Sequence, residues 1–124
     1  MKALKPEIEK IGRLKKRSDF LWVQQNGRKW IAKSLIVEMA DNTSRGERLG
    51  IRYGLTVSKK VSKLAVKRNL IKRRLRAVAQ EVLPDYAAQN LDVVLIARAG
   101  ADTKDFDILK RDFIWCLKKM EITP

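Results

Sequence analysis

The sequence contains no histidine and one cysteine, Cys116, among its 124 residues. A lone cysteine cannot form an intrachain disulfide, and its presence alone is typical of a chain from a reducing compartment. Without histidine there can be no Ser-His-Asp triad and no histidine general base, and the single cysteine leaves no ligand set for a tetrahedral zinc site. The composition therefore excludes several common forms of protein-borne catalysis.

Long apolar runs are also missing. No stretch approaches the length of a membrane span, and no signal-peptide pattern opens the chain. We therefore expect a cytoplasmic protein without a membrane partner. The apolar fraction of 45% and the length of 124 residues predict one compact domain.

Positive charge is what the sequence has in excess. It holds 28 Lys and Arg against 14 Asp and Glu, a formal net charge of +14. A field of this sign favours a polyanionic partner, nucleic acid ahead of an anionic membrane. The excess concentrates in residues 59–76, KKVSKLAVKRNLIKRRLR, which contain nine Lys or Arg and no acidic residue. A helix that only needs solubility usually mixes both signs, so this run predicts an RNA- or DNA-binding face.

Hydrophobic periodicity predicts an α+β sandwich with one mixed sheet of about four strands, in the order α-β-β-β-α-β-α. Residues 1–15 are expected to form a flexible basic arm, and residues 16–124 a single RNA-binding domain. A first helix is capped by Ser18 and ends at Gly27, and a last one is capped by Asp102 or Thr103. Strands are expected at residues 30–40, 49–57 and 91–98, giving two or three strands before the basic helix of residues 63–83.

A helical wheel divides the basic helix into two faces. The apolar residues form one stripe that should face the sheet: Leu64, Ile71, Leu75, Val78 and Val82. Asn69, Lys72, Arg73 and Arg76 fall together on a polar face. Leu70 lies off the apolar stripe, so it is either an incidental exposed leucine or an apolar contact inside an interface.

These residues resemble the bacterial ribonuclease P protein component. The family's basic helix reads Ala65-Val66-Lys67-Arg68-Asn69-Leu70-Ile71-Lys72-Arg73 in this chain, preceded by the strand and lysine pair of residues 54–60, GLTVSKK. Residues 13–27 and 92–99 match the family's amino-terminal element and its last strand. Leu70 replaces the second Arg of the family's Arg-Asn-Arg core, and Gln24 and Glu38 stand where the family often has aromatics.

The resemblance implies the protein subunit of a ribonucleoprotein endoribonuclease. Its RNA subunit removes the 5′ leader of precursor tRNA with magnesium bound mainly by RNA, and one protein serves each RNA subunit. The family places the basic helix in a left-handed βαβ crossover, where it binds the ribonuclease P RNA. We assign that contact to Lys67, Arg68, Asn69, Lys72, Arg73 and Arg76.

The resemblance also implies a cleft for the single-stranded leader, where an aromatic platform beside cations suits unstacked bases. We assign the cleft to Phe20, Arg17, Lys33, Arg52, Thr56, Lys59 and Lys60, with core packing as the other interpretation of Phe20. No catalytic residue and no metal ligand is expected on the protein itself. The alternatives are a structural RNA-binding protein of the ribosomal type and, less favoured, a protein-only nuclease.

Overall fold

The computed structural model describes residues 11–46 and 49–124. Its main elements follow the chain in the order β1 (Gly12–Arg13), α1 (Arg17–Asn26), β2 (Arg28–Ile31), β3 (Leu35–Asp41), β4 (Arg52–Thr56), α2 (Ala65–Val82), β5 (Leu91–Ala97) and α3 (Phe106–Lys119). Short 3-10 turns lie at Thr43–Arg45, Leu83–Tyr86 and Ala101–Thr103. Apart from β1, this is the predicted order α-β-β-β-α-β-α, so the α+β class is confirmed. Within the described part of the chain, no helix combines the length and apolarity that crossing a bilayer requires.

The sheet has five strands in the order β1-β4-β5-β3-β2. The central strand β5 is parallel to β4 and antiparallel to β3, so α2 lies in a βαβ crossover as predicted. The hand of that crossover stays a prediction of the resemblance. The fifth strand, Gly12–Arg13, pairs parallel with β4, and Leu14 beside it is buried. Residues 11–14, which the sequence analysis assigned to an arm, are therefore part of the fold, whereas residues 1–10 of that arm lie outside the described residues.

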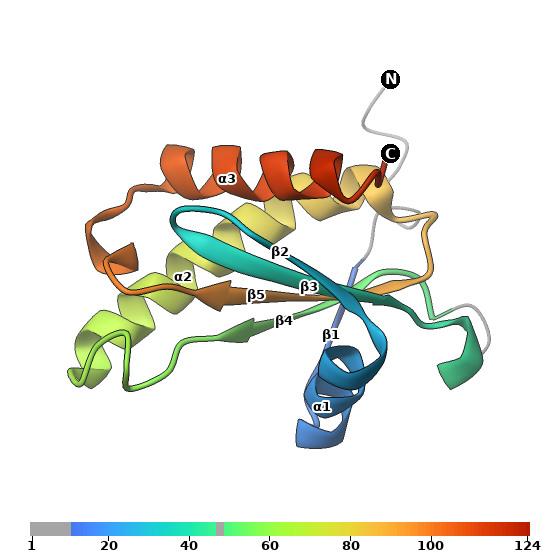
Figure 1. Ribbon diagram of the computed structural model, residues 1–124, viewed down its shortest axis with the longest axis horizontal. Helices are drawn as coiled ribbons and strands as arrows, with labels where there is room; N and C mark the ends of the chain where they lie inside the picture. Colours follow the sequence, from blue (N-terminus) through green and yellow to red (C-terminus); the bar gives the residue numbers. More distant parts are fainter. Residues whose placement is uncertain (1–10, 47–48) are drawn as a thin grey trace.

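The helices cover opposite faces of the sheet. Helices α2 and α3 lie on one face and α1 on the other (Figure 1). Successive side chains of a strand point to opposite faces. Accordingly, Val93 and Leu95 of β5 belong to the main core under α2 and α3, and Val94 packs in a smaller cluster with Leu14 and Val23 beneath α1. The polar face of β4 therefore lies on the side of α1.

Two expected helix starts are corrected. Helix α1 begins at Arg17, ahead of Ser18, and no side chain caps it. Helix α3 is capped by Asp105, whose carboxylate accepts a hydrogen bond from the Ile108 N–H at 3.0 Å. Asp102 and Thr103, the predicted caps, form a 3-10 turn instead.

The apolar stripe of α2 is confirmed except at its first position. Ile71, Leu75, Val78 and Val82 are buried. Leu64 is 56% exposed, because it precedes the first helical residue, Ala65, and its own backbone is extended.

The predicted single strand at residues 30–40 is wrong, because β2 and β3 form a hairpin that turns at Lys33 and Ser34. The Ser34 N–H and hydroxyl donate to the Asp112 carboxylate at 3.2 and 2.6 Å. Arg98 donates to the Ala32 carbonyl at 2.7 Å. Side chains far along the chain form hydrogen bonds with the polar groups of this turn. The turn therefore needs none of the glycine, asparagine or proline that mark most turns.

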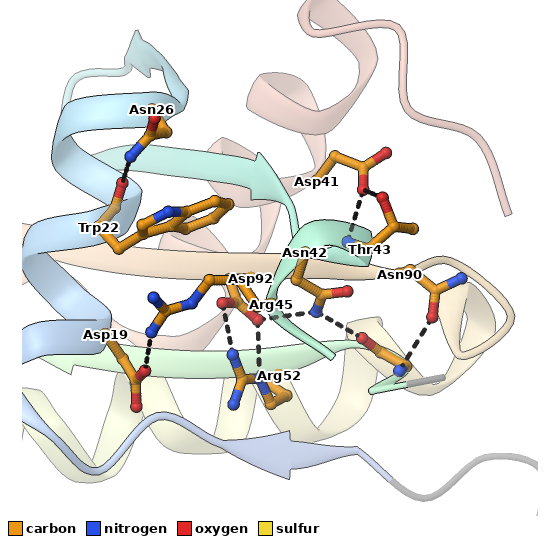
Figure 2. Close-up of polar contacts among 11 residues, drawn as sticks. Asp19, Trp22, Asn26, Asp41, Asn42, Thr43, Arg45, Arg52, Asn90 and Asp92 are labelled. Carbon is orange, nitrogen blue, oxygen red and sulfur yellow. Dashed lines mark hydrogen bonds and ion pairs between the residues drawn. The ribbon is translucent and has the colours of Figure 1, made fainter. Parts of the chain in front are cut away.

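A buried carboxylate joins the central strands. Asp92 of β5 is fully buried and accepts two hydrogen bonds from the Arg52 guanidinium, at 2.8 and 2.7 Å. It accepts a third from the Asn42 amide at 2.8 Å, and the same amide donates to the Gly50 carbonyl. Figure 2 shows that this network ties the loop after β3 to β4 and β5.

Removing one partner of a buried ion pair leaves the other charge unsolvated. We therefore expect Asp92→Ala to lower the free energy of unfolding by about 3 kcal/mol or more, measured by urea denaturation. The control is Glu81→Ala, which breaks the exposed ion pair between Glu81 and Lys110 and should cost less than about 1 kcal/mol. Equal losses in the two variants would contradict a structural role for Asp92.

Candidate nucleic-acid interface

The polar face of α2 forms a shallow basic hollow. It has a volume of about 360 Å³ and is lined by Val66, Asn69, Leu70, Lys72, Arg73 and Arg76. Among residues 11–46 and 49–124, no hydrogen bond or ion pair engages the side chains of Asn69, Lys72, Arg73 or Arg76. The predicted polar face therefore presents one amide and three cations together, and we call it the α2 basic hollow.

The other two residues assigned to this contact are placed differently. Arg68 donates to the carbonyls of Ser62 and Lys63, each at 2.9 Å, and so fixes the segment that enters α2. The Lys67 ammonium lies 3.6 Å from the Asp102 carboxylate. Neither residue lines the α2 basic hollow. The charge run thus includes cations that hold the protein together as well as cations that face outward.

Leu70 lines the α2 basic hollow and lies outside the main core, as the wheel predicted. It is accompanied by Val66, whose side chain is 73% exposed. The hollow therefore combines an apolar portion with its cations.

A second hollow lies along α1. It has a volume of about 490 Å³ and is lined by Lys15, Arg17, Phe20, Leu21, Gln24 and Thr56. The structure thus brings Arg17, Phe20 and Thr56 together, as predicted, and we call this hollow the α1 cleft. Lys15 and Leu21, which were not predicted for the cleft, also line it. Leu21 could have been found, because Arg17, Leu21 and Gln24 follow the i, i+4, i+7 spacing of one helical face.

Phe20 lies directly on β4, over Gly54. A Cβ atom at Gly54 would lie 2.5 Å from two atoms of the Phe20 ring, so the close approach requires glycine. Phe20 also packs against the small cluster beneath α1. Both interpretations of Phe20 therefore describe one side chain that is anchored at the sheet and lines the α1 cleft.

The remaining residues assigned to the leader cleft do not line this cavity. Arg52 is on the same face of β4, but its guanidinium is bound to Asp92. Lys33 lies at the tip of the β2–β3 hairpin and lines a different cavity, beside α3. Lys59 and Lys60 are exposed in the turn that follows β4.

A third hollow, of about 300 Å³, continues beyond Gln24 and is lined by Val23, Gln24, Gly27, Arg28, Lys29 and Glu38. Burial raises the pKa of the Glu38 carboxyl, and the positive charge of Lys29, its partner across the strands, opposes this rise. This third hollow therefore sets an acidic group beside the cations Arg28 and Lys29.

The raised pKa of Glu38 makes stability depend on pH. The folded protein binds this proton more tightly than the unfolded chain, so ionised Glu38 destabilises the fold. This loss of stability is complete above the pKa that Glu38 has in the folded protein, and it vanishes below the ordinary carboxyl pKa of 4.5. We expect Glu38→Gln to be more resistant to urea than the parent at pH 7, with the gap closing as the pH falls toward 4.

The same change at the exposed Glu121 provides the control, because it alters the net charge equally without a buried carboxylate. If the effect of Glu38→Gln is the same at every pH, or matches that of Glu121→Gln, burial of Glu38 is not its cause.

Comparison with known proteins gives a consistent assignment. Residues 8–121 match the protein family described as Ribonuclease P. The chain is 38% identical over 112 residues to the ribonuclease P protein component of Paramagnetospirillum magneticum, covering 90% of this chain and 84% of the relative. It is 44% identical over 111 residues to that of Ruegeria pomeroyi, covering 89% of this chain and 86% of the relative.

Solved structures show the same fold. The RNase P protein of Staphylococcus aureus aligns with a TM-score of 0.76 at 26% identity, covering 93% of this chain and 100% of that one. The RNase P protein of Thermotoga maritima aligns with a TM-score of 0.71 at 25% identity, covering 86% of this chain and 96% of that one. The sequence and the fold thus agree over most of the chain, which belongs to the ribonuclease P protein family and is a protein component of ribonuclease P.

Proposed function

We propose that this chain binds the RNA subunit of ribonuclease P through the α2 basic hollow and holds the single-stranded 5′ leader of precursor tRNA in the α1 cleft. The assembled enzyme then removes the leader, with the chemistry performed by RNA and one protein serving each RNA subunit. The observation that carries this proposal is the group of cations on α2 whose side chains have no hydrogen-bond or ion-pair partner among the residues that the structure describes. Lys72, Arg73 and Arg76 share one hollow on a helix segment that has no acidic residue.

The α2 basic hollow suits structured RNA. A helix anchored by a buried stripe is a rigid support, so its cations keep their spacing when they meet a phosphate backbone. Arg73 and Arg76 can bind phosphate oxygens with two parallel hydrogen bonds, and Lys72 acts as a point charge. Asn69 can donate to or accept from a 2′-hydroxyl.

The α1 cleft suits a single strand. Phe20 offers an aromatic ring on which an unstacked base can lie, and Lys15 and Arg17 lie on the same cavity to neutralise the backbone. Thr56 contributes a hydroxyl at the end of β4. This combination of one aromatic and two cations accepts single strands with little dependence on sequence.

The acidic and thiol side chains of the described residues have structural surroundings. Among the described residues, no three His, Cys, Asp or Glu side chains group as metal ligands would. Asp105 caps α3 and Asp112 accepts from Ser34, so these carboxylates have structural partners. Burial raises the pKa of the Cys116 thiol to about 11, so this thiol is protonated at neutral pH. We therefore assign no step to a metal held by the protein and expect magnesium to be bound mainly by RNA.

The decisive experiment is cleavage of precursor tRNA at low magnesium by the protein, by a bacterial ribonuclease P RNA, and by both. We expect cleavage only from the mixture, or cleavage strongly raised in it, because the protein neutralises phosphates that would otherwise need cations. In the mixture, Arg73→Ala should require more protein for half-maximal stimulation. The slope of log affinity for RNA against log salt concentration should become less steep by about one, because one phosphate contact is lost.

Arg13→Ala removes an exposed cation of the edge strand β1, which lines neither the α2 basic hollow nor the α1 cleft, and serves as the control in this assay. RNA binding without any stimulation would assign the chain to the structural RNA binders. Cleavage by the protein alone would establish a protein-only nuclease and overturn the proposal.

Phe20→Ala tests the α1 cleft separately. Loss of a stacked base costs about 1–3 kcal/mol, so we expect weaker binding of leader-bearing precursor with little change for mature tRNA. Affinities of the assembled enzyme for the two RNAs provide the measurement. An equal loss for both RNAs would assign Phe20 to packing alone.

A further inference from the structure

A second surface with exposed aromatics lies where the β2–β3 hairpin meets α3. Trp30 of β2 is 39% exposed and Trp115 of α3 is 43% exposed. Their ring centroids are 6.2 Å apart, and the ring planes are inclined by 63°, an edge-to-face pair. The neighbouring Ile31 is 51% exposed. Exposed large apolar groups gathered in this way mark an interaction site more often than scattered single residues do.

Two hollows flank Trp115. One, of about 500 Å³, is lined by Ile31, Ala32, Lys33, Arg98, Arg111, Asp112 and Trp115. The other, of about 430 Å³, is lined by Asp107, Lys110, Arg111, Ile114, Trp115 and Lys118. The two hollows share Arg111 and Trp115, so a chain lying along α3 would pass the indole with a hollow on each side. We call these two hollows, together with Trp115 and the adjacent Trp30, the hairpin–α3 surface.

The charge of this surface is mainly positive. The Arg111 side chain is 71% exposed, and the Lys119 ammonium lies 5.7 Å from the centroid of the Trp115 ring. Lys33 and Arg98 line the larger hollow. Asp112, the acidic residue of that hollow, is nearly buried; one carboxylate oxygen accepts hydrogen bonds from Ser34, and the other lies 3.6 Å from the Arg111 guanidinium and offsets part of its charge.

The hairpin–α3 surface is separate from both surfaces of the proposed function. Helix α3 and the hairpin meet on the side of the sheet opposite α1, so Trp115 cannot reach the α1 cleft (Figure 1). None of its lining residues belongs to α2. The two assigned RNA contacts therefore leave this surface without a role.

Three kinds of occupant are conceivable for an aromatic surface with a cationic rim. A second copy of this chain is disfavoured, because each copy carries a net charge of +14. An acidic protein would satisfy the cations but has no particular need for two exposed indoles. Unstacked nucleotides use both features, since bases stack on indoles while phosphates meet Lys and Arg.

We propose that the hairpin–α3 surface is a second binding site for single-stranded RNA, in which a base stacks on Trp115 and Arg111 and Lys33 neutralise the adjoining phosphates. The inference depends on the proposed function only in taking RNA as the partner. It predicts that the free protein can bind single-stranded RNA at two places on opposite sides of the sheet.

The experiment uses a short oligouridylate carrying bromouridine and the Trp22→Phe protein, whose remaining indoles are Trp30 and Trp115. We expect binding to quench the tryptophan emission and irradiation to link the oligonucleotide to an α3 peptide. Trp115→Leu in this background should remove most of the quenching and lower the affinity about fivefold or more for the lost stack. Arg111→Gln, which changes an exposed side chain, should lower the salt slope by about one.

Phe20→Ala is the matched control, because it removes the aromatic of the α1 cleft and leaves the hairpin–α3 surface intact. It should preserve both the quenching and the link to α3. Unchanged affinity in Trp115→Leu and Arg111→Gln, or links confined to α1 and β4, would overturn the inference and leave the leader cleft standing. Self-association of the parent that Trp115→Leu abolishes would assign the surface to a second copy and also overturn it.

Discussion

The buried carboxylate of Asp92 is the constraint on which the arrangement of the sheet and of α1 depends. It lies in the central strand, where an unpartnered charge would cost several kcal/mol. Arg52 and Asn42 satisfy it, which fixes β4 and the loop after β3 relative to β5. That loop carries Arg45, whose guanidinium bonds Asp19 of α1 at 2.6 Å. The position of α1, and with it the α1 cleft, therefore depends on a network in which Arg52 serves the fold rather than a ligand.

The two-faced sheet separates the two assigned RNA contacts. On one face, α2 buries an apolar stripe and leaves its cations outside, so a rigid basic rod results. On the other face, Gly54 allows Phe20 to lie against β4, and α1 leaves a hollow beside the ring. The row of cations on α2 and the aromatic ring on β4 therefore lie on different faces of the sheet. The fold provides each on its own side, joined through the shared strands β4 and β5.

Hydrophobic periodicity in the sequence predicted which side chains of a helix are buried. The apolar stripe of α2 was confirmed beyond Leu64 because each side chain's environment follows from the helical periodicity. The roles of individual cations were not predictable in this way. The sequence shows that Arg68 is charged but not that it bonds the carbonyls of Ser62 and Lys63. The hairpin at Ser34 was missed for the same reason, since its turn is stabilised by Asp112, far along the chain.

Leu70 illustrates how such a basic helix balances two requirements. It stands between Lys67 and Arg73, three residues from each, and like charges at this spacing on a helix repel one another. A leucine here removes two such repulsions in the free protein, where the charge of Lys67 is already offset by Asp102 at 3.6 Å. The cost is one fewer cation for RNA. Together with Val66 it leaves an apolar contact within the α2 basic hollow, suited to a ribose or a base face rather than a phosphate. In the proposed complex, RNA phosphates offset the repulsion among the remaining cations. RNA that binds the folded protein more tightly than the unfolded chain then stabilises the fold, by an amount that grows with the logarithm of its concentration relative to its dissociation constant.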